Sequence, residues 1–167
     1  MILTLNKYKR MYQPEKFHLF IASFLLLATV ACHNNVVMEK SMKIEGESWD
    51  IDEIKVFEKE FTDTVSLYDM YFNVRNNHEY PYSNLFVFFH TEFPDGRIFK
   101  DTLEMILADR QGKWTGKGFG KIKSNSFHFR KDVWFPLEGT YKFSVQHAMR
   151  DEELTGITDV GIRIEKK

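Results

Sequence analysis

From Ile51 onward, hydrophobic and polar residues alternate with a period of two, the pattern typical of β-strands with one buried face. In residues 67–74, Tyr68, Met70, Phe72 and Val74 fall on one side of the expected strand. The same alternation recurs in residues 141–146 and 160–165. Successive side chains of a strand point to opposite faces, so each segment is predicted to pack one face on a core and turn the other to solvent.

The segment 93–97 predicts a tight turn between two such strands. It contains Pro94, which fixes φ, and Gly96, which accepts the positive φ of a hairpin bend. Residues 85–93 and 97–107 are therefore expected to pair as a hairpin.

The same reasoning along the chain predicts seven strands. They lie near residues 53–61, 66–75, 84–93, 97–107, 127–135, 140–148 and 158–166. Seven short strands at this spacing indicate an all-β fold, a single antiparallel β-sandwich over residues 49–167. The longest insertion, 108–120, is expected to be an ordered loop in which Trp114 and Phe119 fold back as plugs; the alternative is that these aromatics contact a protein or ligand.

The strand around residues 85–89 departs from alternation because both of its faces are apolar. Leu85, Val87 and Phe89 lie on one face, and Phe86 and Phe88 on the other. Either the second face is covered, or Phe86 and Phe88 form an exposed patch suited to a partner. Covering by the N-terminal segment or by a loop is the favoured interpretation.

The N-terminal region has the layout of a secretory signal peptide over residues 1–31. Basic residues in 7–16 precede an apolar run, 17–31, which ends in Ala31 before Cys32. As a helix this run would span roughly 22 Å, short of the ~30 Å hydrocarbon core, so a retained membrane span is the weaker interpretation.

Cys32 is the single cysteine of the chain, and residues 29–32 resemble the bacterial lipoprotein signal in which the cysteine is acylated. Two or more acyl chains anchor a protein stably in a membrane. Residues 32–48 are expected to form the lipidated cysteine and a flexible tether of roughly 20 Å. The first acid after Cys32 is Glu39; acids directly after the cysteine resemble a surface-export signal in Bacteroidetes-type lipoproteins, so their absence favours the periplasmic face.

Charge and glycine spacing argue against nucleic acids and nucleotides as ligands. Of 23 basic and 24 acidic residues, four basic and one acidic lie in residues 1–31, so the expected mature chain carries a net charge of about −4. Such a chain offers no basic field for a polyphosphate backbone. The run 112–118 lacks the glycine spacing of a P-loop and the Ser or Thr after its lysine. No cofactor is predicted.

Catalytic and metal-binding motifs are also missing from the sequence. The histidines after Cys32 are scattered, and His147 continues an apolar strand phase, so it is interpreted as a core-edge residue. There is no Gly-x-Ser-x-Gly motif, and an acylated Cys32 could not act as a nucleophile. Arg150 and Arg163 could contact carboxylates of a partner, although an internal pair with Asp151 or Asp159 is the simpler interpretation. We therefore expect no catalytic residue and no metal ligand.

Several segments, taken in order, resemble the gliding-motility lipoprotein GldH family of Bacteroidetes. They are Asn73–Asn77, Tyr80–Leu85, Phe93–Gly96, Asp101–Glu104, Gly112–Trp114, Gln146–Arg150 and Gly156–Glu165. The resemblance runs from about Trp49 to the C-terminus. It implies an envelope lipoprotein needed for gliding, a surface movement driven by an envelope-spanning motor linked to type IX secretion, and it transfers no catalytic residue to this chain.

The leading hypothesis is therefore a noncatalytic accessory subunit, anchored through acyl chains on Cys32, that docks onto other gliding and secretion proteins of the envelope. The alternative is a carbohydrate-binding β-sandwich lipoprotein, because aromatic side chains stack on sugars as well as fill cores. An enzyme using carboxylates is the third and weakest hypothesis. The residues expected to contact a partner are Trp114, Phe119, Phe86, Phe88, Arg150 and Arg163.

Overall fold

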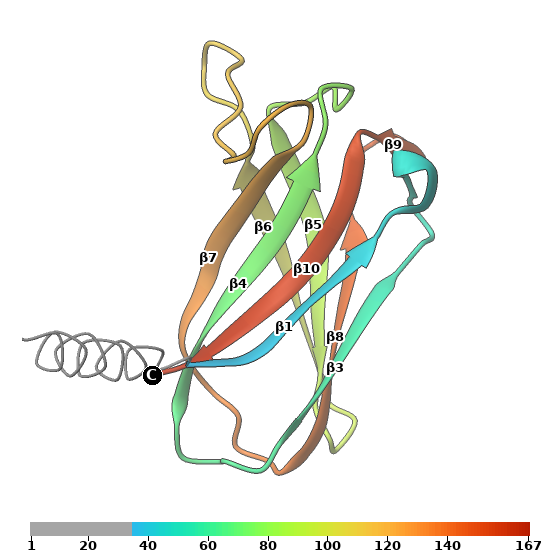
Figure 1. The fold of residues 1–167 in the computed structure, drawn as a ribbon. Coiled ribbons are helices and arrows are strands. Elements are labelled where there is room, and N and C mark those ends of the chain that lie inside the picture. Colours follow the sequence, from blue (N-terminus) through green and yellow to red (C-terminus); the bar gives the residue numbers. More distant parts are fainter. Residues whose placement is uncertain (1–34) are drawn as a thin grey trace, which may run out of the picture. The chain divides into compact units, whose positions relative to one another are not determined.

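The strands lie in two four-stranded antiparallel sheets that face each other (Figure 1). The computed structural model describes residues 35–167, so the expected signal peptide and Cys32 lie outside the described residues. The first sheet has the order β1-β10-β4-β7 and the second the order β3-β8-β5-β6, while β2 and β9 form a separate short pair. The predicted all-β fold of antiparallel sheets is confirmed.

All seven predicted strands are present, with boundaries shifted by a few residues. They are β3 (Lys55–Phe61), β4 (Leu67–Asn76), β5 (Asn84–Glu92), β6 (Ile98–Ile106), β7 (Lys123–Trp134), β8 (Gly139–His147) and β10 (Ile157–Lys166). Three further strands were not predicted: β1 (Val36–Lys43), β2 (Ser48–Asp50) and β9 (Glu153–Thr155).

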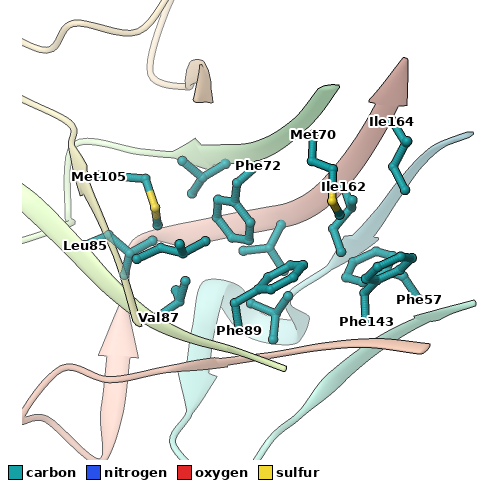
Figure 2. Close-up of a cluster of buried hydrophobic side chains, with 14 of the residues drawn as sticks. Phe57, Met70, Phe72, Leu85, Val87, Phe89, Met105, Phe143, Ile162 and Ile164 are labelled. Atoms are coloured by element: carbon teal, nitrogen blue, oxygen red, sulfur yellow. The ribbon is translucent and has the colours of Figure 1, made fainter. Parts of the chain in front are cut away.

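The core fills the space between the two sheets, as the alternating pattern predicts. Figure 2 shows Met70 and Phe72 of β4 on one side of the cluster, with Leu85 and Phe89 of β5 opposite. All four side chains are buried. A period of two places every second side chain on the inner face, so strands of these lengths close a core from both sheets.

The predicted hairpin between β5 and β6 is also confirmed. The Phe93 amide donates to the Arg97 carbonyl at 2.8 Å, and Gly96 takes a φ of 82°. From this turn, β5 and β6 pair without a register break from Glu92 and Ile98 to Asn84 and Ile106. The turn chemistry therefore sets the register of this half of the second sheet.

The prediction of a flexible tether is wrong from Val36 onward. Strand β1 pairs with β10 along its length, and the 3₁₀ turn Glu45–Glu47 and β2 follow it. The strand was missed because Met38 is its one buried residue, which leaves no clear alternation to detect. Pairing with β10 supplies the order that its own sequence pattern does not signal. No helix within residues 35–167 is long and apolar enough to cross a membrane.

Candidate functional site

The outer face of the second sheet exposes Phe88, which lies between Thr102 of β6 and Gln146 of β8. Leu85, Val87 and Phe89 point into the core and are fully buried, whereas Phe88 on the opposite face is 43% exposed. Phe86 is half-buried. Within residues 35–167, no loop covers Phe88 fully, and the predicted cover by the segment before residue 35 lies outside the described residues.

Phe86, two residues before Phe88 on the same strand, lines a pocket of about 290 Å³, which we call the Phe86 pocket. It is lined by Tyr82, Phe86, Ala148, Met149 and Arg150. The segment after β8 continues along β5, where the Ala148 amide donates to the Phe86 carbonyl at 2.8 Å. The Phe86 amide in turn donates to the Met149 sulfur at 3.3 Å. Phe86 and Arg150, predicted separately as contact residues, thus line one pocket.

The rim of the Phe86 pocket is polar on two sides. The Tyr82 hydroxyl donates to Asp151 Oδ2 at 2.7 Å, and this bond to a carboxylate raises the pKa of Tyr82 above its ordinary value. Arg150 is exposed at the same rim. An apolar floor with a cation and an anion at its edge can accept an apolar side chain flanked by a charge.

The two aromatic residues of the loop between β6 and β7, Trp114 and Phe119, differ in burial. A turn closed by Asp109 precedes Trp114: its carboxylate accepts the Lys113 amide at 2.9 Å, and Gly112 takes a φ of 78°. Trp114 is partly buried against the core beside Tyr80, with ring centroids 6.4 Å apart. Trp114 therefore acts as the predicted plug.

Phe119 does not act as a plug. Its side chain is fully exposed. The loop here is held by other bonds, since the amides and carbonyls of Lys117 and Ser124 pair at 2.8 and 2.9 Å. The main chain thus closes this turn while the Phe119 ring stays in solvent. The alternative interpretation of Phe119, as a contact residue, stays a prediction.

A second depression, the polar groove, lies on the first sheet, with a volume of about 510 Å³. Its lining includes Arg75 and Asn73 of β4 and Asp159 and Arg163 of β10. Asn73 Oδ1 accepts the Ser126 hydroxyl at 2.6 Å, which fixes the amide at the groove floor. The groove presents donors and acceptors side by side, in contrast to the apolar Phe86 pocket.

Arg163 forms an internal ion pair, but not the expected one. Its guanidinium pairs with Glu165 and lies over the Tyr71 ring, 5.2 Å from the centroid. Asp159, the expected partner, lies instead 3.9 Å from the Arg75 guanidinium. Residues 159, 163 and 165 share one face of β10, so Asp159 and Glu165 were both possible partners of Arg163 from the sequence. The tertiary structure shows that Glu165 is the partner.

The histidines do not assemble a metal site in the described part of the chain. Within residues 35–167, no group of three or more His, Cys, Asp or Glu side chains is arranged to hold a metal ion. His147, interpreted as a core-edge residue, is fully buried. It packs in the interior against Trp49 rather than facing a ligand.

Sequence reasoning missed that Tyr82 and Met149 line a pocket. Both residues lie in short segments that resemble the family, 80–85 and 146–150, which are far apart in the chain. Strand pairing between β5 and β8 brings the two segments together, with Val87 opposite His147. The resemblance of both segments to the family was the available signal in the sequence. The strand topology then brings the two segments together at one pocket.

Comparison with known proteins matches nearly the whole described domain. A family model described as GldH lipoprotein matches residues 36–164. The chain is 38% identical to a gliding motility lipoprotein GldH homolog of Christiangramia forsetii, over 90% of this chain and 96% of that protein. It is 35% identical to the gliding motility lipoprotein GldH of Flavobacterium johnsoniae, over 87% of this chain and 96% of that protein.

Proposed function

This chain belongs to the GldH lipoprotein family, and from that premise we propose that it is a noncatalytic accessory component of the gliding machinery linked to type IX secretion. The family assignment makes it a lipid-anchored envelope lipoprotein of gliding motility. The observation that carries the proposal is that the match extends from β1 to β10, so the whole sandwich is the unit shared with these relatives. We propose that this unit acts by docking onto other envelope proteins.

The anchor in this proposal is Cys32, acylated and held in the outer membrane with the domain facing the periplasm. Replacing Cys32 with Ala should release the protein from the membrane fraction and abolish surface spreading, while the domain stays folded, because Cys32 precedes the first strand. As a control, the same variant placed behind the signal and cysteine of an unrelated outer-membrane lipoprotein should regain both anchoring and spreading. Normal spreading by a fully soluble Cys32→Ala protein would contradict the proposal.

The Phe86 pocket is the proposed docking site for a partner protein of the envelope. An apolar pocket with an exposed Arg150 at its rim has the character of an interface centre, where aromatic and arginine side chains contribute most of the binding energy. This use extends the sequence prediction for Phe86 and Arg150. Phe88 lies two residues farther along the same strand face and would widen the contact.

Crosslinking in native membranes, followed by identification of the copurified proteins, tests this docking. The Arg150→Glu variant should lose a reproducible envelope partner and spread poorly, without a change in thermal stability. Lys131→Glu reverses another exposed cation, on β7, and should keep both properties. Equal loss of the partner in both variants would assign the effect to net charge and count against the pocket.

The polar groove favours one alternative function, binding of a carbohydrate. Asn73, Arg75 and Asp159 offer amide, guanidinium and carboxylate groups within one groove, a set that can bond to several hydroxyls. A glycan screen of the domain, repeated with Asn73→Ala, tests this alternative. Binding that disappears in the variant would support it, and a screen without any binding would remove it.

A further inference from the structure

The outer-face residues of β6 are complementary to the same residues of a second β6 that runs antiparallel to the first. The residues on its outer face are Ile98, Lys100, Thr102, Glu104 and Ile106. When a second β6 runs antiparallel with Thr102 opposite Thr102, each Lys100 faces Glu104 and each Ile98 faces Ile106. We propose that β6 pairs with β6 of a second copy of this chain, which joins two sandwiches through one continuous eight-stranded sheet.

The main chain of β6 is oriented for this pairing. Leu107 and Arg97, at the two ends of the strand, bond to Ser83 and Phe93 on the β5 side, at 2.7 and 2.8 Å. In an antiparallel ladder these bonded positions recur every second residue, so the odd-numbered residues of β6 face β5. The even-numbered residues therefore turn their N–H and C=O groups toward the free edge. Within residues 35–167, β5 is the one strand paired with β6.

Two local bonds already engage the main chain of this edge, and the Asn84 side-chain amide donates to the Glu104 carboxylate at 2.8 Å. The Thr102 amide donates to Asp101 Oδ1 at 2.9 Å, and the Thr115 hydroxyl donates to the Ile106 carbonyl at 3.2 Å. The first bond would be exchanged for the Thr102 carbonyl of the second copy. The second leaves one lone pair of the Ile106 carbonyl available, so neither bond closes the edge.

The side chains select one register over its neighbours. The two adjacent registers that keep the same hydrogen-bond pattern place Ile98 opposite Glu104, or Lys100 opposite Ile106. The proposed register instead gives two Lys–Glu pairs and two Ile–Ile pairs, and cross-strand pairs of these kinds stabilise a sheet. Ile98 is 57% exposed and Ile106 is 50% exposed, so pairing would bury apolar surface at both ends. The exposed Phe88 lies directly beside Thr102 and adds to this surface.

The other edges of the two sheets are less open to a second strand. On the opposite side of the sandwich, Lys40 reaches across from β1 to the Glu58 carbonyl of β3 at 2.9 Å, and Lys55 reaches from β3 to the Lys43 carbonyl of β1 at 3.0 Å. The pairing of β7 with β4 shifts register twice, and Asp132 takes a φ of 54°. Lysines and bulges of this kind protect sheet edges from further pairing. By contrast, β6 keeps regular register throughout.

Cysteine crosslinking of the full, membrane-anchored chain tests the geometry. Antiparallel hydrogen-bonded positions have Cα atoms about 5.5 Å apart, within the range that a disulfide spans. The Thr102→Cys protein should therefore oxidise to a covalent homodimer in intact envelopes. Glu60→Cys, exposed on the opposite edge strand β3, is the matched control and should stay monomeric. No homodimer from Thr102→Cys, or equal crosslinking of both, would overturn the proposal, as would a crosslinked product containing a different protein.

A charge exchange gives an independent readout that does not depend on disulfide formation. Lys100→Glu or Glu104→Lys should weaken self-association by about tenfold, because each turns two attractive cross-strand pairs into two repulsive ones. The double variant should restore it. Lys142→Glu changes a lysine on the outer face of β8, which pairs internally with Glu92, and should leave self-association unchanged. Failure of the double variant to restore dimers would count against the pairing, whatever the single variants do.

Discussion

The indole of Trp49 and the imidazole of His147 meet edge to face, with ring centroids 5.4 Å apart, and both side chains are fully buried. Trp49 lies on β2, and its Nε1 donates to the Glu53 carbonyl at 2.8 Å. His147 ends β8, and neither of its ring nitrogens has a hydrogen-bond partner among the described residues. The contact ties the short β2–β9 pair to the second sheet and places a titratable ring in the interior.

This burial predicts that the domain loses stability in mild acid. Burial lowers the pKa of His147, and the nearby carboxylates of Asp50 and Asp151 oppose that shift without overcoming it. The unfolded chain therefore binds a proton more readily, so this contribution is complete above pH ~6.5 and falls by up to about 1.4 kcal/mol per pH unit below it.

Urea unfolding of the domain at pH 7.5, 6.5 and 5.5 measures this effect. His147→Leu keeps a similar volume and removes the titrating ring, so its free energy of unfolding should vary less with pH over this range. An unchanged pH dependence in the variant would show that other groups account for it.

Gly156 should tolerate no side chain. Its φ is 84°, and a Cβ there would lie 2.3 Å from the Tyr80 amide nitrogen. Gly156→Ala should therefore destabilise the domain by well over ~1 kcal/mol, since main-chain atoms would have to move. Gly46 has a φ of 65° with open space around it, so Gly46→Ala should cost only about 1 kcal/mol. Equal losses in chemical denaturation would contradict the steric argument.

Two phenylalanines should respond in opposite ways to truncation. Phe72→Ala removes a fully buried ring from the core and should lower the free energy of unfolding by about 3–5 kcal/mol. Phe119→Ala removes a fully exposed ring and should change it by less than about 0.5 kcal/mol. Chemical denaturation of both variants checks this contrast. A large loss in Phe119→Ala would show that its ring packs against the protein after all.

Asp63 should titrate at unusually low pH. Its carboxylate accepts the Lys166 ammonium at 2.5 Å, together with the hydroxyl and amide of Ser66 and the amide of Val65, and these bonds lower its pKa. The associated stability is therefore present at neutral pH and is lost only as the pH falls below the ordinary carboxyl range. Carboxyl NMR titration of the native protein checks the shift.

In the Lys166→Met variant, the pKa of Asp63 should rise toward that of a free aspartate, because its largest favourable contact is gone. Asp95 is a useful internal reference, since its pKa is lowered by bonds to Arg97 and Lys166 is not among its partners, so it should not respond to this substitution. A parallel change at Asp95 would indicate a global effect instead of a local bond.

Local patterns were sufficient wherever one strand buries one face. The alternation through Phe72 and Val74 predicted β4, and Pro94 with Gly96 predicted the hairpin that sets the register of β6. Strand β1 was missed because its order comes from pairing with β10, a partner more than a hundred residues away in the chain. The candidate contact residues were predicted singly, and their grouping was not.

The amino-acid sequence by itself determined the all-β class, the seven principal strands, the candidate lipidation site at Cys32 and the family resemblance, because each depends on neighbouring residues or short segments in order. Only the tertiary structure decided that Phe86 and Arg150 share a pocket, that Phe119 is exposed and that Arg163 pairs with Glu165. These features depend on which strands lie side by side and on what covers each face. Such contacts join distant segments, and a local pattern of residues carries no information about them.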